Sequence, residues 1–365
     1  MLKPYRDIFA APGSLRFTLA GFIARMPQSL VPLGLIAMLS ELRGQYALAG
    51  AVSATFTLSM AVLSPMVSRI VDKYGQGRVL VPAMGVSAGS ISVMLLCAHF
   101  SAPAWTLFLC AVPAGAMPTM SAMIRARWTE IYGGTPAMTT THSFESVVDE
   151  ITYVLGPALA IMLSVAVFPE FGPLLAVILM VVGVVAFAAQ RRTEPAPRPV
   201  VQHSGSAIRV YPLRLLVFVL FATGLIIGAI DVVSVAFAEQ QGIAEAAGIV
   251  TTCYAFGSGF AGLAFGAWKP RFSLPRQLIV GAAGTALTTL PFLMVGDVAG
   301  LSIAVFAAGA FFAPTMIIVM GLIEKLVPPA QLTEGLTWTA TGVNVGMATG
   351  AGVSGFIVDA HGANT

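Results

Sequence analysis

The sequence predicts an all-α integral membrane protein built from two related groups of helices. Three observations support this fold class: an apolar composition, a series of long apolar runs and a weak internal repeat. Of the 365 residues, 57% are hydrophobic and 10% are charged, and the mean hydropathy is +0.88. Soluble domains carry roughly 25% charged residues, so we expect most of this surface to face lipid.

The net charge, the cysteines and the motifs of the sequence argue against nucleic-acid binding, metal binding and catalysis. A net charge of +3 does not indicate nucleic-acid binding, and the expected surroundings are the lipid bilayer. The cysteines Cys97, Cys110 and Cys253 lie in apolar runs without metal-ligand spacing, so we predict no metal site. The sequence contains no phosphate-binding loop and no Ser-His-Asp pattern, which predicts a protein that is not an enzyme and has no cofactor.

Eleven apolar runs are long enough to cross a bilayer as helices, which requires about 20 residues. They occupy residues 15–38, 46–70, 79–99, 104–124, 144–167, 173–189, 212–237, 246–267, 277–295, 299–322 and 334–358. The longest connection, 191–211, is rich in Pro, Ser and charge and is predicted to be a flexible cytoplasmic linker. It separates a first domain, residues 1–190 with six spans, from a second domain, residues 212–365 with five.

Lys and Arg gather on alternate connections between these spans. The basic set comprises the N-terminal tail, residues 69–78, 125–127, 191–214 and 269–276, and Lys325. Loops on the cytoplasmic side of a membrane are enriched in Lys and Arg. We therefore predict a cytoplasmic N-terminus and a location in the plasma membrane or bacterial inner membrane.

The two halves resemble each other weakly, and the matching residues follow the same order. They pair Ala49 with Ala247, Gly50 with Gly248, Ser68 with Gly266, Lys73 with Arg271, Phe144 with Trp338 and Gly156 with Gly350. Repeats of helices are an architecture of secondary transporters, in which the substrate site lies between the halves near the middle of the membrane. A full repeat includes a twelfth span, which we expect to be absent from this chain.

The turn between the second and third spans carries the most specific pattern, Ser68-x-x-x-Asp72-Lys73-x-Gly75-x-x-Arg78. It resembles a signature of the major facilitator superfamily, Gly-x-x-x-Asp-Arg/Lys-x-Gly-x-Arg/Lys-Arg/Lys, with serine at the first glycine and glycine at one basic position. The resemblance covers the chain apart from the last helix. It implies two pseudo-symmetric six-helix bundles that move a small molecule by alternating access, and we expect a monomer.

In this family the turn holds the cytoplasmic ends of the two bundles together, and the resemblance implies the same role here. Asp72 is expected to meet the start of the eleventh span and a basic residue at the end of the fourth, Arg125 or Arg127. A carboxylate at a helix N-terminus is stabilised by about 0.3–2 kcal/mol, which biases a two-state equilibrium without locking it. The alternative is that Lys73 and Arg78 only set the orientation in the membrane.

Gly156 and Pro157 of the fifth span resemble part of a pattern found in exporters of the superfamily, Gly-x-x-x-Gly-Pro-x-x-Gly-Gly. Thr152, Ala160 and Ile161 stand at the other glycine positions. A Gly-Pro pair can bend a helix and permit close packing. The resemblance therefore favours export, and the alternative is ordinary packing of small residues.

Charged residues inside the spans are candidates for function, because a charge at the bilayer centre costs at least about 2.5–3.5 kcal/mol on insertion scales. Arg25 lies in the first span, and Glu145, Asp149 and Glu150 lie in the fifth. Glu145 and Asp149 share a helix face, whereas Glu150 points about 100° away. We predict an ion pair between Arg25 and either Asp149 or Glu150.

Two roles stay open for this cluster. Neighbouring carboxylates can take up a proton near neutral pH, which would couple transport to the proton gradient. The other role is a structural ion pair that locks the helices, and Glu145 has the further alternative of reaching the cytoplasmic interface. The second half has Asn344 at the position that matches Glu150, so the opposing wall is neutral and suits a polar or cationic substrate.

Gln28 and Asp231 complete the candidate set. Gln28 lies near Arg25 on the first span, so it contributes either to the same site or to a helix–helix hydrogen bond. Asp231, in the outer part of the seventh span, fits either an outer gate or proton coupling. Together these residues predict a proton-coupled secondary transporter, with efflux by antiport favoured over import by symport. A non-transporting membrane sensor or scaffold is the alternative from another class.

Overall fold

The computed structural model describes residues 3–197, 205–242, 247–267 and 272–361. Throughout these ranges the chain consists of helices and connecting turns, without a β-strand. Arg198, Lys269 and Arg271, which contribute to the predicted basic connections, lie outside the described residues. The all-α fold class is confirmed.

The chain is a multi-pass membrane protein. Its helices are α1 (Lys3–Asp7), α2 (Ser14–Arg43), α3 (Tyr46–Tyr74), α4 (Gln76–His99), α5 (Ala104–Ala114), α6 (Met120–Tyr132), α7 (Ala137–Ala166), α8 (Phe171–Ala188), α9 (Tyr211–Gln240), α10 (Ala247–Ala267), α11 (Leu274–Thr289), α12 (Val298–Leu326) and α13 (Leu332–His361). Within the described ranges, nine helices are long and apolar enough to cross a membrane: α2, α3, α4, α7, α8, α9, α10, α12 and α13. They fall on all of the predicted spans except the fourth and the ninth.

The predicted fourth span is interrupted between α5 and α6. Pro118 lies in the break and has no N–H group with which to continue a helix. The Ser87 hydroxyl donates to the carbonyl of Ala114 at 2.6 Å, and the Ser64 hydroxyl donates to the carbonyl of Met117 at 2.9 Å. These bonds satisfy carbonyl groups that the break leaves without helical partners, as the membrane interior requires.

The predicted ninth span is also not a single long helix. Its α-helical part, α11, has 16 residues and is followed by a 3-10 turn over Leu290–Met294. Pro291 lies at the start of this turn, where its ring and its missing N–H group oppose continuation of the α-helix.

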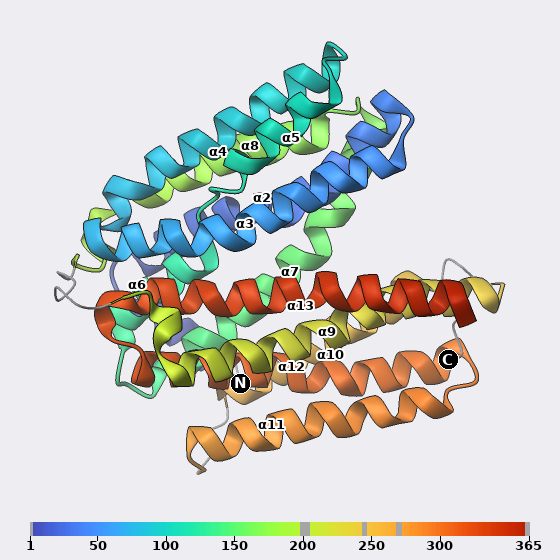
Figure 1. Cartoon of the computed structure of the whole chain (residues 1–365). Coiled ribbons are helices and arrows are strands. Elements are labelled where there is room, and N and C mark those ends of the chain that lie inside the picture. The colour runs from blue at the N-terminus through green and yellow to red at the C-terminus, as the bar shows by residue number, and fades with distance from the viewer. Residues whose placement is uncertain (1–2, 198–204, 243–246, 268–271, 362–365) are drawn as a thin grey trace.

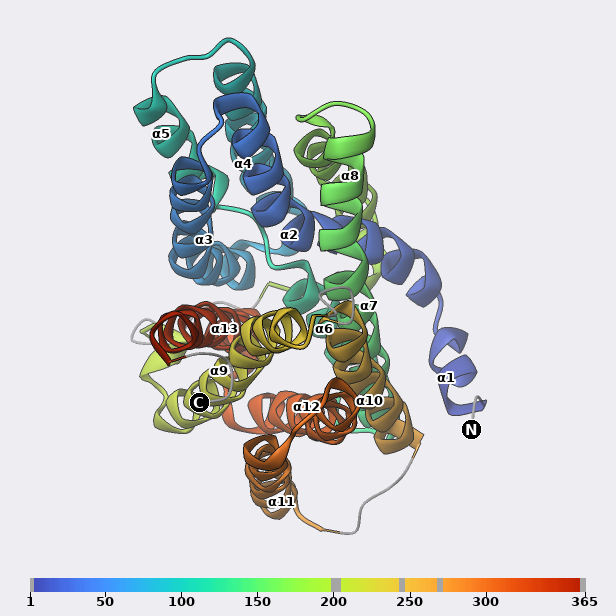
Figure 2. The same cartoon turned by 90° about the vertical axis from the view of Figure 1, so that its right-hand side faces the viewer.

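Two groups of helices converge at one end of the molecule and diverge at the other (Figure 1). The first group comprises α2 to α8, of which α6 and α7 reach towards the second group, α9 to α13 (Figures 1 and 2). We call the converging end, where α3 joins α4, the gate end. We call the diverging end, where α2 joins α3, the far end. Between the groups, α3 packs against α13, and α7 packs against α10 and α12.

Small residues allow the long helices of the second group to approach closely. Gly224 and Gly228 of α9 face the backbone of α13 near Val343 and Met347, and a side chain at either glycine would overlap with that backbone. Close approach of helices at small residues is typical of membrane proteins. The helix α13 therefore packs along α9 on one side and meets α3 of the first group on another.

Candidate functional site

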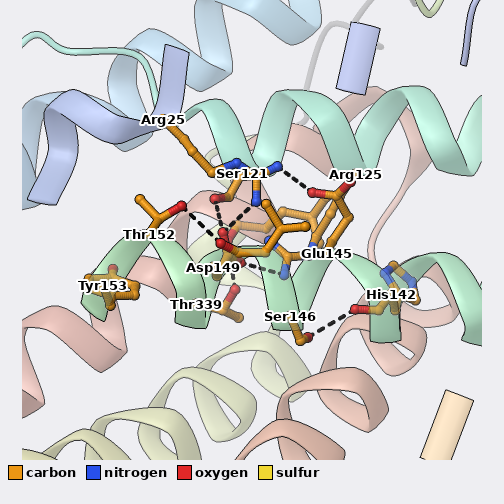
Figure 3. A network of polar contacts seen from close by, with 12 residues as sticks. Arg25, Ser121, Arg125, His142, Glu145, Ser146, Asp149, Thr152, Tyr153 and Thr339 are labelled. Atoms are coloured by element: carbon orange, nitrogen blue, oxygen red, sulfur yellow. Dashed lines mark hydrogen bonds and ion pairs between the residues drawn. The ribbon is translucent and has the colours of Figure 1, made fainter. Parts of the chain in front are cut away.

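Four charged side chains from three helices of the first group form one cluster (Figure 3). Arg25 of α2 donates to Glu145 and, at 2.8 Å, to Asp149 of α7. Arg125 of α6 donates to the other oxygen of Asp149 at 2.7 Å, and the Ser121 hydroxyl donates to the first oxygen at 2.6 Å. The side chains of Arg25 and Arg125 are 1% and 3% exposed. Positive and negative charges therefore balance in a site that is largely removed from water.

Helical spacing on α7 explains this arrangement. Glu145 and Asp149 lie one turn apart on the face of α7 that is turned to α2 and α6. Glu145 also accepts a hydrogen bond from the indole N–H of Trp128 at 2.8 Å, and its side chain is 0% exposed. The alternative in which Glu145 reaches the membrane interface is therefore wrong. The expected contact of Arg25 with Asp149 is present, and Glu145 is an additional partner.

Glu150 is not a partner of Arg25, so the second of the two expected pairings is wrong. Its position on α7 is rotated about 100° from that of Asp149, which turns it towards the second group. There the carboxylate accepts a hydrogen bond from the Ser258 hydroxyl of α10 at 2.6 Å. Two adjacent carboxylates thus differ in surroundings: Asp149 faces two guanidinium groups, and Glu150 faces a neutral hydroxyl across the contact between the groups.

A cavity of about 220 Å³ lies between the two groups. Its lining residues are all uncharged: Gln28, Thr57, Leu58, Met60, Ala61, Ser64, Thr119, Ala340, Thr341, Asn344, Val345, Ala348 and Thr349. The Tyr153 hydroxyl, about one turn from Glu150 on α7, donates to the side-chain oxygen of Asn344 at 3.2 Å. Two of the candidate residues, Gln28 and Asn344, therefore line the cavity. Asp231 of α9 is exposed and belongs neither to this lining nor to the charge cluster.

At the gate end, Asp72 joins the two groups. Its carboxylate accepts hydrogen bonds from the backbone N–H groups of Thr333, at 3.2 Å, and Glu334, at 2.9 Å, in the first turn of α13. A carboxylate there complements unpaired N–H groups and the positive end of the helix dipole. About one turn away, the hydroxyls of Ser68 and Thr337 lie 2.7 Å apart across the same contact. The serine that departs from the signature glycine therefore adds a bond between the groups.

The expected basic partner of Asp72 lies elsewhere. Arg125 is bound to Asp149. Arg127 turns into the first group and stacks on Phe187, with 3.8 Å between the guanidinium carbon and the ring centre. The prediction that Arg125 or Arg127 meets Asp72 is therefore wrong, and the N–H groups at the start of α13 supply the positive partner instead.

The rest of the turn faces away from the second group. Gly75 has a φ of 91°, in the region that favours glycine, and lets α3 turn directly into α4. The side chains of Lys73 and Arg78 are exposed, and the Lys73 ammonium lies 5.0 Å from the ring centre of Tyr74. This placement is compatible with a role of the two basic residues in orientation.

A second set of contacts between the groups is not predicted by the sequence. Ser143 of α7 donates to the carbonyl of Gly262 on α10, and Thr140 donates to the carbonyl of Gly266 at 3.1 Å. A backbone carbonyl that accepts a hydrogen bond cannot be recognised from the residue type, but the internal repeat gives a sequence signal for this contact. It pairs Gly266 with Ser68, and both residues lie where the two groups meet.

Gly156 and Pro157 lie within α7, which continues to Ala166. A Cβ atom at Gly156 would overlap with the side chain of Ser29 on α2. The glycine therefore permits close approach of α7 to α2, which is the packing role expected as the alternative to the export pattern.

Replacing Asp72 with alanine should favour opening of the gate end. The two hydrogen bonds from α13 are worth about 1–2 kcal/mol together, so the ratio of closed to open molecules should fall about 5- to 30-fold. Spin labels at Arg16 and Arg276, which are exposed and lie in different groups, report this change as a distance. Lys73→Ala is the control, and an equal response of both variants would contradict the role of Asp72.

Comparisons with known proteins agree with this architecture. A model of the Major Facilitator Superfamily matches residues 17–246 and 216–365. The search of curated proteins gives no significant match.

Several solved structures are similar. The human organic anion transporter MFSD10 (TETRAN) is 14% identical, with a TM-score of 0.70 over 97% of this chain and 96% of that chain. A bacterial homologue of the iron transporter ferroportin in an outward-facing state is 13% identical, with a TM-score of 0.70 over 94% and 92%. FucP in the outward conformation is 14% identical, with a TM-score of 0.64 over 95% and 92%. At these identities the likeness concerns the fold.

Proposed function

The chain belongs to the major facilitator superfamily, a family of secondary transporters of small molecules, and on that basis we propose that it exports a small organic molecule in exchange for protons. The observation that carries this proposal is Glu150, an intramembrane carboxylate that joins the two helix groups through Ser258. Carboxylates inside membrane spans are rare and mark proton relays and substrate pathways. The membrane is the plasma membrane or a bacterial inner membrane, with the gate end in the cytoplasm.

In this proposal Glu150 binds a proton in one conformation and releases it in another. With the gate end closed, its carboxyl group contacts a single hydroxyl in a largely apolar interface, where the neutral acid is less costly than the carboxylate. Rocking of the groups separates α7 from α10, removes Ser258 and brings water to the carboxyl group from the gate end. Proton uptake from the far end and release at the gate end then accompany each cycle.

Asp149 has a different role in this proposal. Its two oxygens face Arg25 and Arg125, and these charges hold it as a carboxylate. The four-charge cluster thus locks α2, α6 and α7 together within the first group. Of the two roles predicted for the cluster, the structural one suits Asp149 and Glu145, and proton coupling suits Glu150.

The lining of the cavity supports the proposal of a polar or cationic substrate. Its uncharged amides and hydroxyls can bind a polar molecule, and its volume of about 220 Å³ limits the size of that molecule. The hydrogen bond between Tyr153 and Asn344 connects the wall of the cavity with the helix that carries Glu150. A substrate with one positive charge would compete with a proton for Glu150, which is the requirement for exchange. Export is further supported by the partial exporter pattern at Gly156 and Pro157.

Everted membrane vesicles test this function. Respiration acidifies the lumen, a dye in the lumen reports its pH, and small amines, other cations, drugs, sugars and amino acids are added in turn. We expect at least one polar or cationic compound to drive protons out of the lumen when the wild-type protein is present. Glu150→Gln should abolish this response while leaving the amount of folded protein unchanged. Glu41→Gln, an exposed acid at the far end, is the control.

Three other outcomes would contradict parts of the proposal. Loss of the response in Asp231→Asn but not in Glu150→Gln would move coupling to α9. Protein-dependent uptake of a labelled compound into whole cells, without proton movement in vesicles, would replace export by import. Full activity of Glu150→Gln together with Asp231→Asn would exclude both carboxylates from coupling.

A further inference from the structure

A histidine and a glutamate face each other across the two groups near the gate end, and the proposed function makes no use of them. The side chain of His142 on α7 is 2% exposed, and its Nε2 atom lies 3.2 Å from Oε1 of Glu324 on α12. The Thr129 hydroxyl of α6 donates to the same oxygen of Glu324. The side chain of Glu324 is 13% exposed, so the contact is shielded from water.

The other groups around His142 leave Glu324 as its acidic partner. Besides His142, the titratable or charged residues on α7 and on the helices packed against it are Glu145, Asp149, Glu150 and Tyr153 on α7; Lys3, Tyr5, Arg6 and Asp7 on α1; Arg16, Arg25, Glu41 and Arg43 on α2; Arg125, Arg127, Glu130 and Tyr132 on α6; Cys253 and Tyr254 on α10; and Glu324 and Lys325 on α12. Among these acids, Glu324 is the one whose carboxylate contacts the His142 ring. Glu145, Arg25 and Arg125 are bound within the charge cluster. Within the part of the chain that the structure describes, the ring nitrogens of His142 have no polar partner besides the contact of Nε2 with Glu324. Figure 3 shows His142 on the same helix as the cluster, beyond Glu145.

We infer that a proton on His142 latches the gate end shut through an ion pair with Glu324. The two side chains belong to different groups, so their contact exists only while the gate end is closed. A neutral imidazole offers the carboxylate in this shielded contact no charge from α7, whereas an imidazolium supplies both a charge and a second N–H donor. Opening separates the two and hydrates each of them. The closed state therefore gains more from the proton than the open state does.

The pH dependence of the latch has a definite sign. Because the closed state binds the proton more tightly, a lower pH at the gate end favours closure and a higher pH favours opening. If the proposed function holds, each export cycle brings protons into the cytoplasm, and the latch slows the cycle as the cytoplasm acidifies. That consequence rests on the proposed function, whereas the latch itself does not.

Closure can be measured without any substrate. Spin labels at Arg16 and Arg276 give the distance between the groups in lipid nanodiscs over a range from about pH 5.5 to 8.5. Glu150→Gln serves as the background, because it removes the other proposed titrating group. We expect the ratio of closed to open molecules to rise at least about fivefold as the pH falls. His142→Gln and Glu324→Gln should each flatten this change.

His99→Gln is the matched control. His99 is 63% exposed and contacts Glu170, at 2.8 Å, within the first group, so its removal should leave the pH response unchanged. A response of unchanged size in His142→Gln or in Glu324→Gln would overturn the latch, and so would loss of the response in His99→Gln. The two variants remove opposite partners, so either one decides the question if the other fails to fold. Failure of proton exchange in the vesicle experiment leaves this result unaffected.

Discussion

Asp149→Asn is expected to lower the free energy of unfolding by about 3–5 kcal/mol. The substitution keeps the shape of the side chain but removes the negative charge that Arg25 and Arg125 share. Glu145 then remains as the one acid in the cluster, and a positive charge is left without compensation in a site largely removed from water. Breaking a buried pair by removing one partner costs far more than removing both partners, because the remaining charge keeps its desolvation penalty.

The double variant Asp149→Asn with Arg125→Gln keeps the charges of the cluster balanced. It therefore separates the effect of an uncompensated charge from the effect of the changed side-chain geometry. Thermal unfolding in detergent should show that it regains at least half of the stability that Asp149→Asn loses. Glu150→Gln is the control on the neighbouring residue, where loss of one bond to a hydroxyl costs about 1 kcal/mol. A double variant as unstable as Asp149→Asn would contradict charge balance as the cause and would assign the effect to the hydrogen-bond geometry of Asp149.

The contacts of the charge cluster that the sequence predicts correctly are those that follow from helical geometry. The sequence places Arg25 and the acids of α7 together because both spans begin on the same predicted side and carry their charges at similar depth. It also predicts that Glu150 turns away from Asp149, from the rotation of about 100° per residue. The partner of Arg125, by contrast, is not predicted correctly from the sequence. The family resemblance implies a contact of Arg125 with Asp72. Only the packing of α6 against α7 decides that Arg125 binds Asp149.

The break in the fourth span shows a second limit of the sequence. Hydropathy is continuous through Pro118, and proline alone does not identify a break, since Pro27 and Pro32 lie inside the unbroken α2. The surroundings of Pro118 are different: the hydroxyls of Ser64 and Ser87 bind the carbonyl groups of Met117 and Ala114, which lie just before it in the chain. Those bonds come from α3 and α4, so they depend on tertiary packing, which a pattern of apolar residues does not encode.

Gly266→Leu on α10 is expected to hold the gate end open and to stop transport. A Cβ atom at Gly266 would overlap with the side chain of Ser143 on α7 and with the hydroxyl of Tyr5, so a leucine there cannot fit while the gate end is closed. Overpacking of this kind costs about 1–3 kcal/mol, which corresponds to a shift of roughly 5- to 150-fold in a two-state equilibrium. The cost applies to the closed state alone, because opening moves α7 away from α10. The variant should therefore stay open at the gate end and lose export.

Gly259→Leu on the same helix is the matched control, because no atom lies within 4 Å of a Cβ placed there. It introduces the same side chain into the same helix, so both variants change helix propensity and apolar surface equally. Spin labels at Arg16 and Arg276 should show a longer distance in Gly266→Leu and an unchanged distance in Gly259→Leu, and the vesicle response should be lost only in the former. If Gly266→Leu closes and transports as the wild type does, then α7 and α10 do not form the gate, and closure depends on the contact of Asp72 with α13 instead.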